Sequence, residues 1–179
     1  MTDNQIKQLV MKFRKAIETA HQKGLFSHDI ALDDFPTGTC GDVSYLLAEY
    51  LKRNGIETIW YSAQRRDWSH AWLVVKDGRV RELTPRMFSW PEELRGVIAG
   101  YGVEHPEKEI EITNYEAEDL QDGLMVDITA DQFEDFDIPV YVGGMDAFHR
   151  TFEFRQAHDY DDLGNGRLVS LYETIEKYL

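Results

Sequence analysis

The single cysteine of the chain, Cys40, has the position best suited to nucleophilic chemistry. It follows Gly38 and Thr39 at the predicted start of a helix, where backbone N–H groups lack acceptors and the helix dipole is positive. Both effects stabilise a thiolate, the reactive form of a cysteine. The same N–H groups can stabilise an oxyanion on an attacked carbonyl, and Gly41 allows close approach of a substrate. The opposing interpretation is a small, buried and inert side chain, which is common for lone cysteines.

His70 is the candidate base for Cys40. It lies in a predicted strand over 69–75 and shares a face with Trp68 and Trp72, because strand residues alternate between faces. We therefore expect the imidazole to lie among large rings. Strand histidines are more often structural, and a catalytic one needs an acid that orients the ring and fixes its tautomer.

Two acids, Glu82 and Asp127, could orient His70. A two-residue turn at Asp77-Gly78 would return Glu82 on the next strand but on the opposite face, whereas a bulge would reverse that face. Asp127 lies in a later predicted strand whose apolar residues face the core, which turns its carboxylate to the other side. The sequence favours Asp127 as the acid and leaves Glu82 as the alternative.

The elements that must position these residues follow from hydrophobic periodicity. Thr39 and Asp42 predict a capping box at the start of the helix that carries Cys40, and Asn54-Gly55 predicts its end. Helices come first and mostly antiparallel strands follow, which indicates an α+β domain. The predicted helices are a first one capped by Thr2 or Asp3 and stopping near Gly24, a second over 39–54 and a C-terminal one around 168–175; the predicted strands are 56–63, 69–75, 79–83, 124–129, 138–142 and 148–154.

One stretch, 84–122, interrupts this pattern. We interpret it as an insertion with short elements of its own, within a single domain that covers 1–179. The residues 89–92 predict a helix start in it. Its buried side would consist of Leu94, Val97 and Ile98.

Composition excludes several classes of function. The chain has 42% hydrophobic residues, enough for a core, and a net charge of -14, which repels phosphate backbones and anionic lipids. Nucleic acid and membrane surfaces are therefore not expected partners. Segment 1–15 has no apolar signal core, and no apolar run approaches the ~20 residues of a membrane span. A lone cysteine without a disulfide partner suits the cytoplasm.

Three short motifs carry a resemblance. Residues 39–42 (Thr-Cys-Gly-Asp), 69–72 (Ser-His-Ala-Trp) and 127–129 (Asp-Ile-Thr) occur in the order Cys, His, Asp. This order resembles the transglutaminase-like branch of papain-like cysteine enzymes, in which a cysteine opens a helix and the histidine and aspartate occupy adjacent strands. In those relatives a short hairpin joins the two strands, whereas an insertion separates them here.

Longer strings point the same way. Residues 35–42 and 126–133 are similar to those of a group of small bacterial proteins with this core, and 149–152 resembles a later motif of that group. For His149 itself, a structural role near the cleft is the favoured interpretation.

The resemblance implies a papain-like core with N-terminal helices packed on the sheet, and a Cys40, His70, Asp127 triad. His70 would take the proton of Cys40, and the sulfur would attack an amide carbon to give a thioester that water or an amine releases. The substrate would be a peptide, a protein or an amide-containing small molecule, with no cofactor. The second oxyanion donor stays open among the candidate glutamines: Gln5, Gln8, Gln22 and Gln132.

Two rival interpretations remain at this stage. One is a binding, immunity or adaptor protein that keeps the fold without the chemistry. The other is a zinc site built from Cys40, His70 and an aspartate. No closely spaced pair of cysteines or histidines supports zinc, so no metal is expected.

Overall fold

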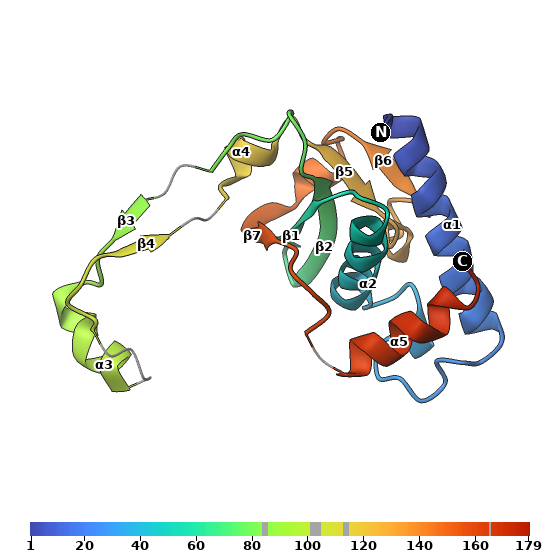
Figure 1. Ribbon diagram of the computed structural model, residues 1–179, viewed down its shortest axis with the longest axis horizontal. Coiled ribbons are helices and arrows are strands. Elements are labelled where there is room, and N and C mark those ends of the chain that lie inside the picture. Colours follow the sequence, from blue (N-terminus) through green and yellow to red (C-terminus); the bar gives the residue numbers. More distant parts are fainter. Residues whose placement is uncertain (84–85, 101–104, 113–114, 165) are drawn as a thin grey trace.

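A five-stranded antiparallel sheet lies at the centre of the protein (Figure 1). The computed structural model describes residues 1–83, 86–100, 105–112, 115–164 and 166–179. Helices and an antiparallel sheet together confirm the predicted α+β class. In sheet order the strands are β6 (Tyr141–Gly143), β5 (Leu124–Asp127), β2 (Trp68–Val75), β1 (Thr58–Arg65) and β7 (Glu153–Asp159).

Two helices, α1 (Asp3–Gln22) and α2 (Cys40–Arg53), pack against one face of this sheet, and α5 (Gly166–Glu176) packs against these two helices. Their apolar stripes meet Leu73 and Val126 in one buried cluster. Thr2 caps α1 in a capping box with Gln5, as one of the two predicted caps requires. Across the described residues, no helix is both long and apolar enough to cross a bilayer.

The opposite face of the sheet carries a second, aromatic cluster. Alternation along β5 separates the two, because Leu124 and Val126 join the helix-side cluster while Met125 joins the aromatic one. That division confirms the predicted faces of this strand. Trp72, Phe133 and Phe152 form part of the aromatic cluster.

The start of α2 differs from the prediction. Thr39 precedes the helix, but its hydroxyl donates to the Pro36 carbonyl 2.8 Å away and caps nothing. Asp42 instead accepts a hydrogen bond from Arg167, at 2.8 Å. The capping-box prediction is therefore wrong, because each side chain has a stronger partner outside the helix. The predicted end is confirmed: Gly55 follows the last turn with a φ of 76°, which favours glycine.

The hairpin predicted at Asp77-Gly78 is also wrong, since 79–83 forms no strand. Asp77 accepts hydrogen bonds from the backbone N–H and the side chain of Arg79, and the Arg79 guanidinium also pairs with Asp3. These contacts turn the chain away from the sheet. β2 pairs with β1 through a tight turn in which Arg66 has a φ of 55°, and with β5 on its other side.

Two later strands are shifted from their predicted positions. β6 starts at Tyr141, at the end of the predicted 138–142. The predicted 148–154 begins with a 3-10 turn over His149–Thr151, and the strand β7 only follows at Glu153. The Asp146 side chain accepts the backbone N–H of His149, which favours a turn there.

The stretch between β2 and β5 projects from the sheet as an arm (Figure 1). The predicted helix start is present, but Leu94 and Val97 are 44% and 56% exposed and Ile98 is half-buried, so its predicted buried side is wrong. Tyr115 and Leu120, at the base of the arm, are buried in the aromatic cluster. The elements of the arm are β3 (Arg86–Phe88), a 3-10 turn (Glu92–Leu94), α3 (Arg95–Gly100), β4 (Ile110–Ile112) and α4 (Ala117–Leu120); two further 3-10 turns, Leu32–Asp34 and Ala130–Gln132, lie in the main body.

Candidate active site

Cys40 is the first residue of α2 and is half-buried. One turn later, the Ser44 hydroxyl donates to the Ala71 carbonyl 3.2 Å away and fixes the start of α2 against β2, beside His70. Cys40 lines a cleft of about 1300 Å³. The thiol is therefore accessible from the cleft. Other residues around the cleft include Gln64, Trp68, Gln132, Phe133 and Arg155.

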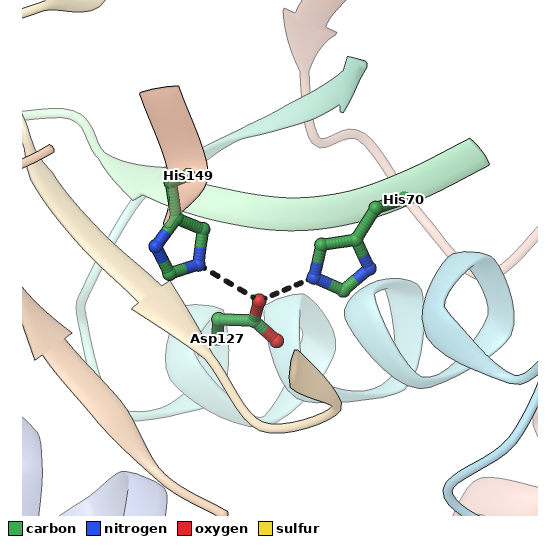
Figure 2. Close-up of side chains that lie close together, drawn as sticks. All are labelled: His70, Asp127 and His149. Atoms are coloured by element: carbon green, nitrogen blue, oxygen red, sulfur yellow. Dashed lines mark hydrogen bonds and ion pairs between the residues drawn. The ribbon is translucent and has the colours of Figure 1, made fainter. Parts of the chain in front are cut away.

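His70 lies in β2, the strand to which the start of α2 is joined. Its side chain is fully buried among the rings of Trp72, Phe133 and Phe152. Of the two tryptophans that alternation in β2 predicted around it, Trp72 is in contact, whereas Trp68 is 65% exposed. Nε2 lies 2.5 Å from Oδ2 of Asp127 (Figure 2), and the Cys40 side chain lies near enough to the ring to influence its pKa. Because Asp127 occupies Nε2, Nδ1 is the nitrogen left to face the thiol.

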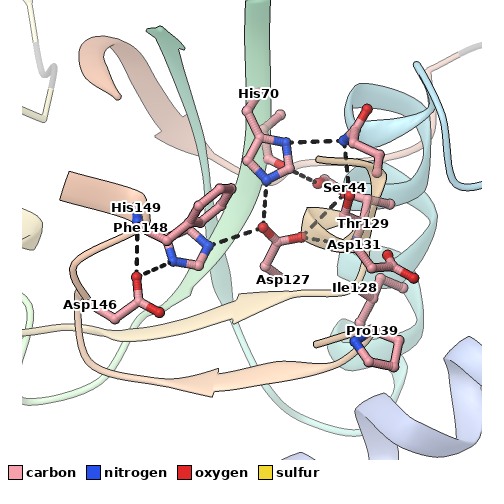
Figure 3. Close-up of polar contacts among 12 residues, drawn as sticks. Ser44, His70, Asp127, Ile128, Thr129, Asp131, Pro139, Asp146, Phe148 and His149 are labelled. Carbon is pink, nitrogen blue, oxygen red and sulfur yellow. Dashed lines mark hydrogen bonds and ion pairs between the residues drawn. The ribbon is translucent and has the colours of Figure 1, made fainter. Parts of the chain in front are cut away.

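Asp127 ends β5 and is 1% exposed. Its Oδ1 accepts the backbone N–H of Thr129 at 2.8 Å and the Thr129 hydroxyl at 3.2 Å, while its Oδ2 faces His70 (Figure 3). The turn at Ile128 and Thr129 therefore holds the carboxylate in one orientation. Arg14 of α1 donates to the Ile128 carbonyl and fixes that turn from the helix side.

The charges in this pair shift both groups toward ionisation. Burial is the largest influence on Asp127 and raises its pKa, but the charge of His70 and hydrogen bonds from both histidines outweigh it and hold this pKa well below its usual range. Burial alone would lower the pKa of His70, but the charge and hydrogen bond of Asp127, with a smaller influence of Cys40, raise it overall to about 9. The imidazole is therefore a strong proton acceptor in a dry environment.

Gln132 joins the cleft loop to the triad. Its Oε1 accepts the backbone N–H of Gly38 at 3.0 Å, and its Nε2 donates to the Thr129 carbonyl at 2.9 Å. These two bonds fix the amide so that Nε2 also faces Nδ1 of His70, at 3.4 Å. That contact is long and therefore weak. Of the glutamines considered as oxyanion donors, Gln5, Gln8 and Gln22 lie in α1, and Gln132 shares the cleft with Cys40.

His149 is a member of this network that the sequence did not assign to it. Its side chain is fully buried, and its Nε2 lies 3.1 Å from Oδ2 of Asp127, the same oxygen that faces His70 (Figure 2). Its Nδ1 lies 2.7 Å from Oδ1 of Asp146 (Figure 3). The signal available in the sequence was the 149–152 motif, without a chemical reason for the histidine.

Glu82, the alternative acid, is exposed and lies outside regular secondary structure. The side-chain hydrogen bonds described for His70 join it to Asp127 and Gln132, and Cys40 influences its pKa. The structure thus brings Cys40, His70 and Asp127 together in that order.

Metal binding is the alternative role for these buried histidines and carboxylates. Within the described ranges, the ligand atoms of His70, Asp127 and His149 lie within 4.8 Å of one another, and Cys40 is not part of that group. At 2.5 Å, however, the contact between Nε2 of His70 and the carboxylate requires a shared proton, which leaves this nitrogen no lone pair for a metal. The arrangement fits proton transfer better than metal binding.

Comparison with family models, curated proteins and solved structures gives no match for this chain.

Proposed function

We propose that the protein is a cysteine-dependent hydrolase or acyl transferase that attacks amide carbonyls through Cys40. The observation that carries the proposal is the grouping of three side chains: a cleft-lining cysteine at a helix start, an imidazole whose pKa that cysteine influences, and a buried carboxylate 2.5 Å from Nε2 of the same ring. Nucleophile, base and orienting acid in this order are what acyl transfer requires.

The first half of the reaction forms the thioester. Nδ1 of His70 takes the thiol proton, and the sulfur of Cys40 bonds to the carbonyl carbon, whose oxygen becomes negative. When the C–N bond breaks, the leaving amine takes the proton from Nδ1. Asp127 keeps its negative charge throughout and stabilises the imidazolium. Water or a second amine then attacks the thioester, giving its proton to His70, and the thiol re-forms.

Two donors for the oxyanion follow from this arrangement. The backbone N–H of Cys40 belongs to the first turn of α2, where N–H groups have no acceptor within the helix. The second donor we propose is the side-chain amide of Gln132. Once Nδ1 of His70 holds the thiol proton, it no longer accepts from this amide, so one N–H becomes available to the substrate oxygen.

The same contacts support a transglutaminase-like, papain-like core as a proposal. Cys40 opens a helix and the histidine and aspartate strands, β2 and β5, are neighbours in the sheet, with Leu73 opposite Val126. The open cleft suits a peptide, a protein segment or an amide-containing small molecule. With a net charge of -14, we propose no nucleic acid or membrane partner and a cytoplasmic location.

Thiol alkylation tests the proposal. The wild-type protein should react with iodoacetamide at pH 7 about tenfold faster than free cysteine or more, because on this proposal the neighbouring imidazole takes the thiol proton as the sulfur attacks. Cys40→Ala should abolish labelling, and His70→Gln should bring the rate to that of an ordinary thiol.

Acyl transfer itself is tested with p-nitrophenyl acetate as a general probe. One nitrophenolate should be released per protein in a burst, with an acetyl group found on Cys40 by peptide mass analysis. An alkylation rate equal to that of free cysteine, together with no acetylated Cys40, would refute the enzyme.

A binding protein is the second candidate, and the arm is the observation in its favour. Met87, Leu94 and Val97 expose apolar surface there, away from the sheet. A slow, ordinary thiol in the test above would favour this candidate.

A further inference from the structure

His149 has a carboxylate oxygen at each ring nitrogen. Nε2 lies 3.1 Å from Oδ2 of Asp127, and Nδ1 lies 2.7 Å from Oδ1 of Asp146. A neutral imidazole carries one N–H and one lone pair, so it would place its lone pair against one of these oxygens. An imidazolium donates to both.

The surroundings favour that charge state. The His149 ring is fully buried, so water does not take the place of either carboxylate as a hydrogen-bond partner of its nitrogens. The titratable groups that face it are Asp127 from β5, Asp146 from the preceding loop, Tyr141 from β6 at 5.1 Å between ring centroids, and His70 from β2 at 6.3 Å. The Tyr141 hydroxyl donates to the Gly144 carbonyl and so does not compete for the histidine. The two carboxylates, Asp127 and Asp146, therefore balance two positive charges, one on His70 and one on His149.

We infer that His149 is a positioning residue that carries a proton on both ring nitrogens and bridges Asp146 to the triad acid Asp127. As part of the catalytic apparatus this inference rests on the proposed function, whereas the charge state of His149 does not. Its role is to hold Oδ2 of Asp127 from the side opposite to His70 and to share its negative charge (Figure 3).

Sharing the carboxylate has a consequence for catalysis. With Asp127 alone, His70 would hold its proton so firmly that returning it to the leaving amine would be slow. The second cation beside the same oxygen weakens that hold, since like charges oppose each other across a buried carboxylate. His149 thereby brings His70 closer to the range useful for both taking and giving a proton.

The charge state is tested by ¹⁵N NMR of the histidine side chains in Cys40→Ala, which removes the thiol from the titration. At pH 7 both nitrogens of His149 should show shifts of protonated imidazole nitrogens. Asp146→Asn keeps an acceptor for the backbone N–H but removes the charge, and it should convert one of the two nitrogens to the unprotonated type. One unprotonated nitrogen in the Cys40→Ala protein itself would overturn the inference.

The positioning role is tested by titrating His70 in the same background. His149→Gln keeps one donor toward Asp127 but removes the charge, so His70 should lose its proton about one pH unit higher than in Cys40→Ala alone. If His149 were merely structural, the variant would loosen the pocket and move the midpoint of His70 downward or not at all. Either of those results would overturn the role.

These outcomes are separable from the proposed function. A doubly protonated His149 beside an unreactive Cys40 would leave the inference about its charge standing while the enzyme proposal fails. A reactive Cys40 beside a neutral His149 would do the reverse.

Discussion

The two faces of the central sheet are built differently. The helix-side cluster, under α1, α2 and α5, is made of aliphatic and aromatic side chains such as Phe13, Leu47 and Val126. The opposite face surrounds His70, Asp127 and His149 with rings, and each of these three polar side chains has a hydrogen-bond partner. Truncating a buried apolar side chain lowers the free energy of unfolding roughly in proportion to the volume removed. Removing one partner of a buried charged network lowers it because the other partner is left buried without compensation. The helix side is therefore built for stability, whereas the aromatic side holds a buried polar network that carries a desolvation cost.

The largest loss of stability should come from the helix side. Phe13 is fully buried in α1 and stacks on Tyr50 with 5.1 Å between ring centroids. Phe13→Ala should lower the free energy of unfolding by about 3–5 kcal/mol, because it leaves a cavity. Urea denaturation measures this. The alkylation rate of Cys40 per folded molecule should not change, and a drop after correction for the folded fraction would break the comparison.

Removing the carboxylate of Asp127 should lower the free energy of unfolding slightly less than Phe13→Ala does, but it should remove most of the reactivity of Cys40. Asp127→Ala leaves two buried imidazoles without their common acceptor, and we expect a loss of about 3 kcal/mol in urea. Iodoacetamide labelling at pH 7 should slow about tenfold or more. Glu82→Ala is the matched control, since Glu82 is exposed, and it should change neither quantity. Equal effects of the two variants would contradict the assignment of the acid.

Alkaline pH should weaken the aromatic side selectively. The pKa of His70 is raised to about 9 in the folded protein, from an ordinary value of 6.5, so its contribution to stability is complete below pH 6.5 and is lost as the pH rises through 9. The loss should amount to about 3 kcal/mol between pH 6 and pH 10. Urea midpoints at several pH values measure it. His70→Gln should lack this slope, and a slope of the same size in that variant would assign it to other groups.

The smallest effect on stability is expected for Gln132, which can be compared with a second glutamine of the same cleft. Gln132→Ala removes bonds to Gly38 and Thr129 and should cost about 1 kcal/mol of stability. Acetylation of Cys40 by p-nitrophenyl acetate should slow about tenfold, as expected for loss of an oxyanion donor. Gln64→Ala, another glutamine of the same cleft, is the control and should leave acetylation unchanged. Equal rates in all three proteins would remove Gln132 from the proposed mechanism.

Periodicity in the sequence was sufficient for the elements that bury a regular face. The stripe in α1, its capping by Thr2 and the alternation along β5 are local patterns, and the structure reproduces them. Patterns that depend on distant partners were not predictable. Asp42 pairs with Arg167 and Arg79 with Asp3, and these contacts replaced a predicted cap and a predicted hairpin.

The candidate site divides in the same way. Cys40 at a helix start and His70 among rings follow from local sequence, and the face of Asp127 follows from strand alternation. His149 could not be assigned, because its partners Asp127 and Asp146 lie in different parts of the fold, and because it was predicted within a strand whereas it sits in a turn. Gln132 could be proposed by residue type alone, and only the fixed direction of its amide gives it a geometric basis.

The separation of β2 and β5 along the chain also has a kinetic consequence. β1 and β2 form a local hairpin, whereas His70 and Asp127 are 57 residues apart in sequence and meet only when the intervening chain has closed on itself. Long-range pairing of this kind forms slowly compared with a hairpin or a helix. During synthesis, His70 would therefore stay without its carboxylate partner until β5 has been made and has paired with β2.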